Sequence, residues 1–212
     1  MLQEAARQFY LQGYKATTMR SLASAVGIKH PSLFSLFENK SAIAAVIMAK
    51  YYQGVQEAAE ALVREDPGGL AEKDAVLLAF HAINFGLLYE DKHIAEFFTS
   101  FYEEDSEGVD AVIASLGHFE EEETGWSEEE NTVYQLDLKV LGMTSMMLTR
   151  ELGEKTILPE FASLYFVRKL ILVRRSSWSV TEEGAERFYR THWEKIRETV
   201  RKIDVYRDYI SL

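Results

Sequence analysis

The chain has 212 residues, enough for one large domain or two modest ones. Hydrophobic residues make up 47% and charged residues 27%, which is typical of a globular protein and excludes a largely disordered chain. Cysteine is absent, so disulfides and thiolate chemistry are excluded. The first 20 residues lack an apolar signal segment, and no run reaches the roughly 18 apolar residues of a membrane span. We therefore expect a cytoplasmic protein with no membrane partner.

The charge is distributed unevenly. The whole chain carries a net charge of -11, but residues 1–50 hold six Lys or Arg against two Glu, a net charge of +4. The remaining residues therefore carry -15. A basic end on an acidic body indicates contact with nucleic acid through the N-terminal part, because polyanionic DNA repels an acidic surface. A chance cluster of lysines would produce the same count.

Only three prolines interrupt the chain, and apolar residues recur at helical spacing throughout, so an all-α fold is predicted. We see no strand alternation of useful length. The predicted helices are 2–12, 19–26, 30–37, 40–64, 71–89, 92–103, 109–119, 128–151, 159–175 and 181–207. The acidic run Glu120–Glu123 reads as a solvated loop or helix end.

The segment Thr18–Phe37 fits a helix-turn-helix. Two helices that cross at about 90 to 120° through a tight turn need a small side chain where they touch and a glycine at the bend. Ala23 and Gly27 supply these, four residues apart. The apolar contacts between the two helices are expected from Leu22, Val26, Ile28, Leu33 and Leu36.

The second helix of this motif would present its N-terminal end and its outward side to base edges in the major groove. Side chains at the starts of the neighbouring helices would bind phosphate, aided by free N–H groups and the helix dipole. The candidate DNA-binding residues are Thr17, Thr18, Arg20, Lys29, His30, Pro31, Ser32, Phe34, Ser35 and Lys40.

Over the first 50 residues the chain resembles the DNA-binding signature of the tetracycline-repressor (TetR) family. The matching positions are Phe9, Gly13-Tyr14, Thr17-Thr18, Leu22-Ala23, Ala25, Gly27-Ile28, Ser32-Leu33-Phe34, Phe37, Asn39-Lys40 and Ala42-Ile43. The resemblance implies a three-helix DNA-binding domain over residues 1–48 and a larger helical ligand-binding and dimerisation domain over residues 49–212. It also implies a homodimer that represses nearby genes and is released from a palindromic operator by a small molecule.

Two positions depart from the family pattern. Position 34 is often tyrosine in the family and position 36 histidine or tyrosine, whereas this chain has Phe34 and Leu36. Two polar contacts to DNA are therefore missing. An alternative interpretation is a helical ligand-binding or scaffold protein whose helix-turn-helix has lost its DNA-binding role.

The region after residue 65 is rich in aromatic residues and methionine, the side chains that line apolar ligand cavities. Most of them would fill the core in any helical protein. The candidate ligand-binding residues, with His81 and Asn84 as polar anchors, are His81, Asn84, Phe85, Tyr89, Phe98, Tyr102, Met143 and Met147.

In the family, the helix pair that corresponds to residues 128–151 and 159–175 forms a four-helix bundle across a dimer axis. The small residues Gly142, Thr144 and Ser145 would allow close helix approach. The candidate interface residues are Leu141, Ser145, Leu148, Leu164, Val167 and Ile171. Burial of these side chains within one subunit is the alternative.

The C-terminal segment 181–212 lies beyond the two helices of that pair and is expected to pack against its own subunit. An enzyme reading would rest on Glu90-x-x-His93, a spacing found in di-iron helical bundles. A second such pair is absent. We expect no catalytic residues, no metal and no cofactor; the expected partners are operator DNA, a small-molecule effector and a second copy of the chain.

Overall fold

The computed structural model describes residues 1–104, 127–174 and 179–211. Within these ranges every regular element is a helix, so the predicted all-α fold is confirmed. The predicted helix 109–119, the acidic run Glu120–Glu123 and the aromatic residues Phe119 and Trp126 lie outside the described residues. No helix in the described ranges is long and apolar enough to cross a membrane.

Three short helices form the N-terminal end: α1 (Leu2–Gln12), α2 (Met19–Ala25) and α3 (His30–Phe34). Gly13 ends α1 with a φ of 89°, a backbone conformation that side chains with a Cβ rarely adopt. The third helix was predicted to reach Phe37 and is shorter, although the amide of Phe37 still donates to the carbonyl of Leu33. The last predicted turn is therefore present as a hydrogen-bonded turn after the helix.

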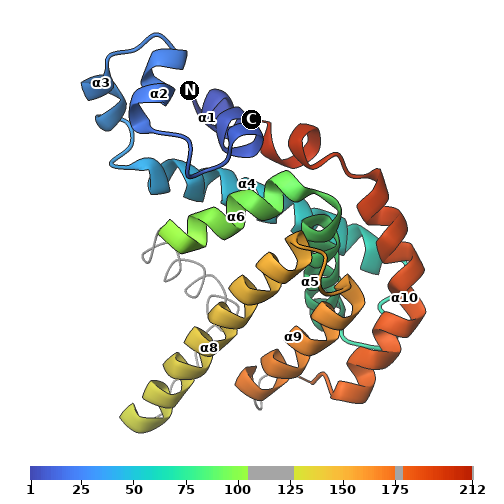
Figure 1. Cartoon of the computed structure of the whole chain (residues 1–212). Helices are drawn as coiled ribbons and strands as arrows, with labels where there is room; N and C mark the ends of the chain where they lie inside the picture. The colour runs from blue at the N-terminus through green and yellow to red at the C-terminus, as the bar shows by residue number, and fades with distance from the viewer. Residues whose placement is uncertain (105–126, 175–178, 212) are drawn as a thin grey trace.

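A long helix, α4 (Lys40–Val63), leads from the three short helices into the rest of the molecule. Asn39 caps it by accepting a hydrogen bond from the amide of Ala42 at 2.8 Å. The expected domain boundary after residue 48 falls inside this helix, so the two parts of the chain share a continuous rod. Figure 1 shows α4 crossing α5 (Glu72–Glu90) and lying beside α6 (Lys92–Glu104).

The helix α5 is buried on almost every side, as a central helix must be, because α4, α6, α8 (Glu128–Gly153), α9 (Pro159–Arg174) and α10 (Glu182–Lys202) pack around it. Gly86 allows α10 to approach closely, since a Cβ at this position would lie 2.7 Å from Cγ2 of Val200. The two halves of the core are joined through aromatic rings: Phe9 of α1 stacks on Phe97 of α6, with ring centroids 5.5 Å apart.

The C-terminal segment packs against its own chain, as predicted, but is not a continuous helix to residue 207. The helix α10 ends at Lys202, and after Ile203 and Asp204 a one-turn π-helix, η1 (Val205–Ile210), follows. This turn packs on α4 and α1, which brings the C-terminus beside the N-terminal helices (Figure 1). Asp204 caps the start of η1, because its carboxylate accepts from the amide of Arg207 at 3.0 Å.

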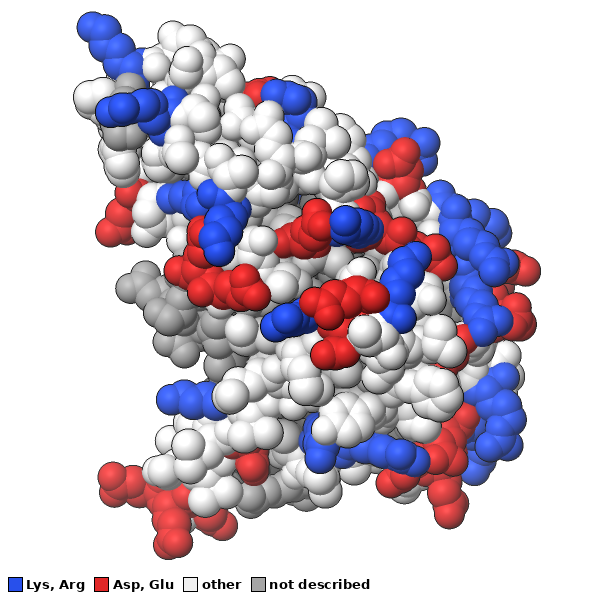
Figure 2. Space-filling view, viewed as in Figure 1, with Lys and Arg blue, Asp and Glu red and all other residues white. Residues whose placement is uncertain are grey.

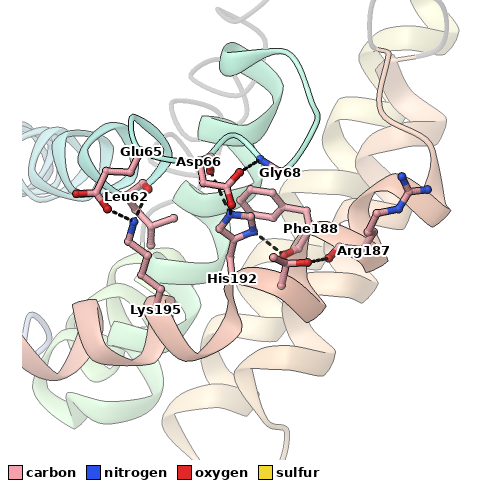
Figure 3. Close-up of polar contacts among 9 residues, drawn as sticks. Leu62, Glu65, Asp66, Gly68, Arg187, Phe188, His192 and Lys195 are labelled. Atoms are coloured by element: carbon pink, nitrogen blue, oxygen red, sulfur yellow. Dashed lines mark hydrogen bonds and ion pairs between the residues drawn. The ribbon is translucent and has the colours of Figure 1, made fainter.

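Polar contacts fix α10 to the turn between α4 and α5 (Figure 3). The buried His192 ring lies with Nδ1 2.9 Å from the carbonyl oxygen of Phe188 and Nε2 3.1 Å from that of Asp66. Lys195 donates to the carboxylate of Glu65 at 2.7 Å and to the carbonyl of Leu62 at 3.1 Å. The segment is therefore held at its middle as well as at its end.

Candidate DNA-binding surface

The turn between α2 and α3 has the geometry that a helix-turn-helix requires. Thr18 begins α2 with a capping box: its hydroxyl accepts from the amide of Ser21 at 3.0 Å, and the Ser21 hydroxyl accepts from the amide of Thr18 at 3.0 Å. Gly27 makes the bend with a φ of 70°. Ala23 and Leu33 are buried where the two helices meet. The motif predicted from the sequence is therefore formed.

The outward side of α3 carries the residues expected to reach base edges. Pro31, Ser32, Phe34 and Ser35 are exposed, Phe34 to 46%. The Ser35 hydroxyl donates to the carbonyl of Ser32 at 2.8 Å and can still accept a hydrogen bond from a second partner. His30 begins α3, and its side chain lies outside the described part of the structure.

Three exposed cations surround this end of the molecule: Lys15 in the turn before α2, Arg20 in the first turn of α2, and Lys29 at the start of α3. None of them has an ion-pair partner within the part of the chain that the structure describes. Figure 2 shows Lys and Arg side chains around the end formed by α2 and α3. Lys15 was not among the predicted contacts, because it lies before α2 and the phosphate contacts were predicted from residues at the starts of helices.

Arg7 adds little to this positive surface. Its guanidinium donates two hydrogen bonds to Glu4, at 2.7 and 2.9 Å. These bonds, with one from Gln8, lower the pKa of Glu4 to about 2, so the carboxylate stays charged and neutralises the arginine.

Two predicted DNA contacts, Thr17 and Lys40, have partners inside the protein in this structure. Thr17 is buried, and its hydroxyl donates to the carbonyl of Gly13 at 3.0 Å, so it stabilises the end of α1. The Lys40 ammonium points inward: it donates to the carbonyl of Tyr14 at 2.9 Å and to the carboxylate of Glu104 at 3.1 Å, and lies 3.9 Å from the centroid of the Tyr14 ring. A lysine at a helix start has a long stem, and here a carbonyl, a carboxylate and a ring face lie within its reach.

Leu36 is wrong as a packing residue. It was expected to hold α3 against α2, yet it is 64% exposed because α3 ends before it. The side of this motif turned to solvent therefore carries two large apolar side chains, Phe34 and Leu36.

The residues expected to line a ligand cavity do not form one group. Phe85 and Phe98 are fully buried in the core, while Met143 and Met147 are exposed, to 65% and 48%. These two methionines are wrong as cavity residues because the buried face of α8 is made by other residues: Tyr134, Leu138, Leu141, Leu148 and Leu152.

Two polar members of that set, Asn84 and Tyr102, are hydrogen-bonded inside the protein. Asn84 accepts from the Tyr51 hydroxyl at 3.0 Å, and the Tyr102 hydroxyl lies 3.2 Å from that of Tyr52. His81 is buried between Phe80 and Phe166, with ring centroids 5.3 and 4.6 Å away. Tyr89 lines a cavity of about 200 Å³ between α5, the start of α9 and α10, and the other seven predicted residues are not part of the lining of this cavity.

The predicted interface residues lie on the inner side of α8 and α9. Leu141, Leu148 and Val167 are buried within the chain, which agrees with the alternative of burial within one subunit; an interface role for them stays a prediction. Ser145, Leu164 and Ile171 are partly buried. The outer sides of both helices are nevertheless apolar: α8 exposes Leu136, Val140, Met143 and Met147, and α9 exposes Phe161, Tyr165 and Leu172.

The fold and this surface define an all-helical protein with an N-terminal helix-turn-helix. Residues 1–47 match the model of the family described as bacterial regulatory proteins, tetR family. The N-terminal part is therefore a TetR-family DNA-binding domain, and the chain is a DNA-binding transcriptional regulator. Comparison of the chain with curated proteins and with solved structures gave no match.

Proposed function

We propose that the chain is a ligand-responsive repressor that binds a palindromic operator as a homodimer and is released by a small, mostly apolar molecule. The observation that carries the proposal is the family match over the helix-turn-helix, together with the exposed cations on that same end. The net charge of the whole chain opposes DNA binding, so contact with DNA is restricted to this end.

In this proposal α3 enters the major groove. Ser32 and Ser35 hydrogen-bond base edges, and Pro31 and Phe34 contact thymine methyl groups. His30 is a further base contact at the start of the helix. Apolar contacts would take over part of the recognition that a tyrosine hydroxyl gives at position 34 in the family.

The phosphate contacts are assigned to Arg20, Lys29 and Lys15, with Thr18 at the N-terminus of α2. Each neutralised phosphate releases counterions, so binding weakens as salt rises, with a slope of about -0.9 per phosphate contact. Lys40 would contribute only after it leaves Glu104.

The dimer is assigned to the outer faces of α8 and α9. The exposed apolar residues of α8 recur at positions 136, 140, 143 and 147, one stripe of a helix, and those of α9 at 161, 165 and 172. Apolar stripes of this kind on a monomer surface mark sites of association. Two α8–α9 pairs related by a two-fold axis would cover each other and place two α3 helices on the two half-sites of an inverted repeat.

The proposal is tested by selecting bound fragments from random-sequence DNA and measuring their affinity at several salt concentrations. We expect an enriched inverted repeat, bound at least about a thousandfold more tightly than unrelated DNA. Failure to enrich any sequence would instead support the alternative, a helical ligand-binding or scaffold protein, for which the exposed Phe34 and Leu36 would be a protein-contact surface.

A further inference from the structure

A cavity lies between α5, the start of α9 and α10, and α10 belongs to the C-terminal segment, for which only packing against its own chain was predicted. We infer that this cavity binds a small aromatic carboxylate, and that its occupant changes DNA binding through Tyr10 of α1. The second half of this inference rests on the proposed function, since it requires that the chain bind DNA.

The size and the floor of the cavity favour one aromatic ring. Its volume is about 200 Å³, somewhat larger than the roughly 150 Å³ of an engineered cavity that binds benzene. Ala82, Ile196 and Val200 form a buried apolar floor, and Tyr89 and Trp193 add aromatic surface at the sides. A single ring with one short polar substituent fits these dimensions.

The polar rim favours a carboxylate. The Trp193 indole N–H donates to Glu160 at 2.5 Å, and the Arg197 guanidinium pairs with the same carboxylate, so one carboxylate of the chain is already held there. Arg201, one helical turn further along α10, has no ion-pair partner within the described residues. It therefore offers a bidentate donor pair to a second carboxylate that enters from solvent.

The rim also carries an acid, Glu90, which would favour a cation instead. Against it stand Arg201 and the nearby Lys155, whose ammonium lies 4.8 Å from the centroid of the Tyr89 ring. The charged side chains that line the cavity, Glu90, Glu160, Arg197 and Arg201, sum to zero, so the preference for a carboxylate rests on the position of Arg201 and on Lys155 beside Tyr89. An aromatic amine is the competing class, and the experiment separates the two.

The two long walls of the cavity both lead directly to Tyr10. The α5 wall ends at Glu90, and the next residue, Asp91, accepts a hydrogen bond from the Tyr10 hydroxyl at 2.6 Å. The α10 wall ends just after Arg201, and four residues beyond its last residue Tyr206 lies with its ring centroid 5.1 Å from that of Tyr10. Burial and Asp91 raise the pKa of Tyr10, so the hydroxyl keeps its proton and remains the donor.

The same end of the chain holds α4. Tyr209 covers Gly54, where even a Cβ would collide with its ring, and the Lys50 ammonium donates to the carbonyl of Ser211. A molecule that moves α10 relative to α5 must therefore shift η1 against both α1 and α4, which are two of the helices that position the helix-turn-helix.

Binding is tested first without DNA, by calorimetric titration with phenylacetate, benzylamine and benzyl alcohol, which share a ring and differ in charge. We expect phenylacetate to bind more tightly than benzyl alcohol, and benzylamine to bind least. Arg201→Gln should weaken phenylacetate binding about tenfold or more, as the loss of a charge-assisted hydrogen bond does. Arg190→Gln, an exposed arginine on the same helix that does not line the cavity, is the matched control and should leave binding unchanged.

Equal loss in the two variants would show that net charge alone attracts the anion and would overturn the site. Preference for benzylamine, abolished by Glu90→Gln, would overturn the carboxylate assignment. Absence of binding by all three compounds would overturn the whole inference.

Coupling is tested with a DNA fragment selected by the protein itself. Saturating phenylacetate should lower its affinity about 5- to 150-fold, the usual range of coupling between two sites. Tyr10→Phe, which removes the hydrogen bond to Asp91 and keeps the ring, should bind phenylacetate normally and lose most of this effect. Phenylacetate that binds but leaves DNA affinity unchanged overturns the coupling. If the protein enriches no DNA sequence, the proposed function is wrong. The titrations still show whether the cavity binds an aromatic carboxylate.

Discussion

Lys40 lies at the start of α4, a position from which its ammonium group could bind a DNA phosphate. In this structure the ammonium group is bound inside the protein instead. It bonds to Glu104 at the end of α6 and to the carbonyl of Tyr14, and its side chain is only 21% exposed. A carboxylate in this position competes with the phosphate for the same cation. DNA binding and the position of α6 are therefore linked through one ion pair.

Replacing Glu104 with glutamine keeps the shape of the side chain and removes its charge, so we expect tighter binding to all DNA sequences, by about 2- to 10-fold at low salt. Glu103→Gln is the matched control, because it changes the net charge by the same amount beside the pair. Affinities are measured by fluorescence anisotropy at several salt concentrations. Equal gains in DNA affinity in the two variants would show that the ion pair with Glu104 does not keep Lys40 from binding phosphate.

Among the described residues Arg20 has no ion-pair partner, and we assign it to phosphate. Arg20→Gln should weaken binding to specific and unrelated DNA alike and reduce the magnitude of the salt slope by about one. Arg64→Gln at the far end of α4 changes the net charge equally and should have little effect. A change in sequence preference for Arg20→Gln would contradict the phosphate assignment.

At the scale of the helices, sequence periodicity predicted the positions of the elements well where the local signal was strong. Thr18, Gly27 and Asn39 each mark a helix boundary by their own chemistry, and the structure has all three boundaries. The end of α10 was missed, because the apolar spacing continues through Ile203 although the helix stops at Lys202. The turn η1 packs on α1 and α4, whose residues are far from it in the sequence, so local spacing does not predict it.

The same reason explains the errors in the site. Apolar residues at helical spacing indicate that a helix has an apolar face, but α8 is apolar on two sides. Leu141 lies inward and Met143 outward, a difference that depends on which neighbouring helices cover α8. The internal partners of Lys40 and Thr17, which are Glu104 and the Gly13 carbonyl, could not be predicted because only the fold brings them together.

The contact between α10 and the α4–α5 turn gives a test of how the C-terminal segment is held. Gly68 and Gly69 both have positive φ angles, of 66° and 76°, so alanine is strained at either position. At Gly68 an added Cβ would also lie 2.9 Å from Cε1 of His192 and 3.0 Å from Cδ2 of Phe188, while at Gly69 it meets nothing within 4 Å. Figure 3 shows the His192 ring beside this turn.

We therefore expect both alanine variants to lower the free energy of unfolding by about 1 to 2 kcal/mol, and Gly68→Ala by about 1 to 3 kcal/mol more. Urea unfolding of the two variants and the parent protein measures the difference. Equal losses would mean that α10 moves away from the turn without cost.

At the scale of the molecule, we propose DNA contacts at one end and dimer contacts on the outer faces of α8 and α9. Met143→Glu would put a charge into the centre of the proposed interface and should shift the protein from dimer to monomer at micromolar concentration. Leu11→Glu, an equally apolar and exposed residue on α1, should leave the dimer intact. Sedimentation equilibrium distinguishes a mass of 24.3 kDa from twice that value.

A monomer that nevertheless binds one asymmetric DNA site would contradict the two-fold arrangement. If the parent protein and the Met143→Glu variant are both dimers, the interface lies on another face of the molecule.

The central claim is that the basic end of this acidic chain binds a specific operator through α2 and α3. The most direct measurement is the affinity of the protein for its selected DNA fragment and for unrelated DNA between about 50 and 200 mM salt, repeated for Lys29→Gln. We expect tight binding to the selected fragment that falls steeply with salt, a much weaker affinity for unrelated DNA, and a smaller salt slope for the variant. Equal affinities for the two DNAs, or a variant with an unchanged slope, would contradict it.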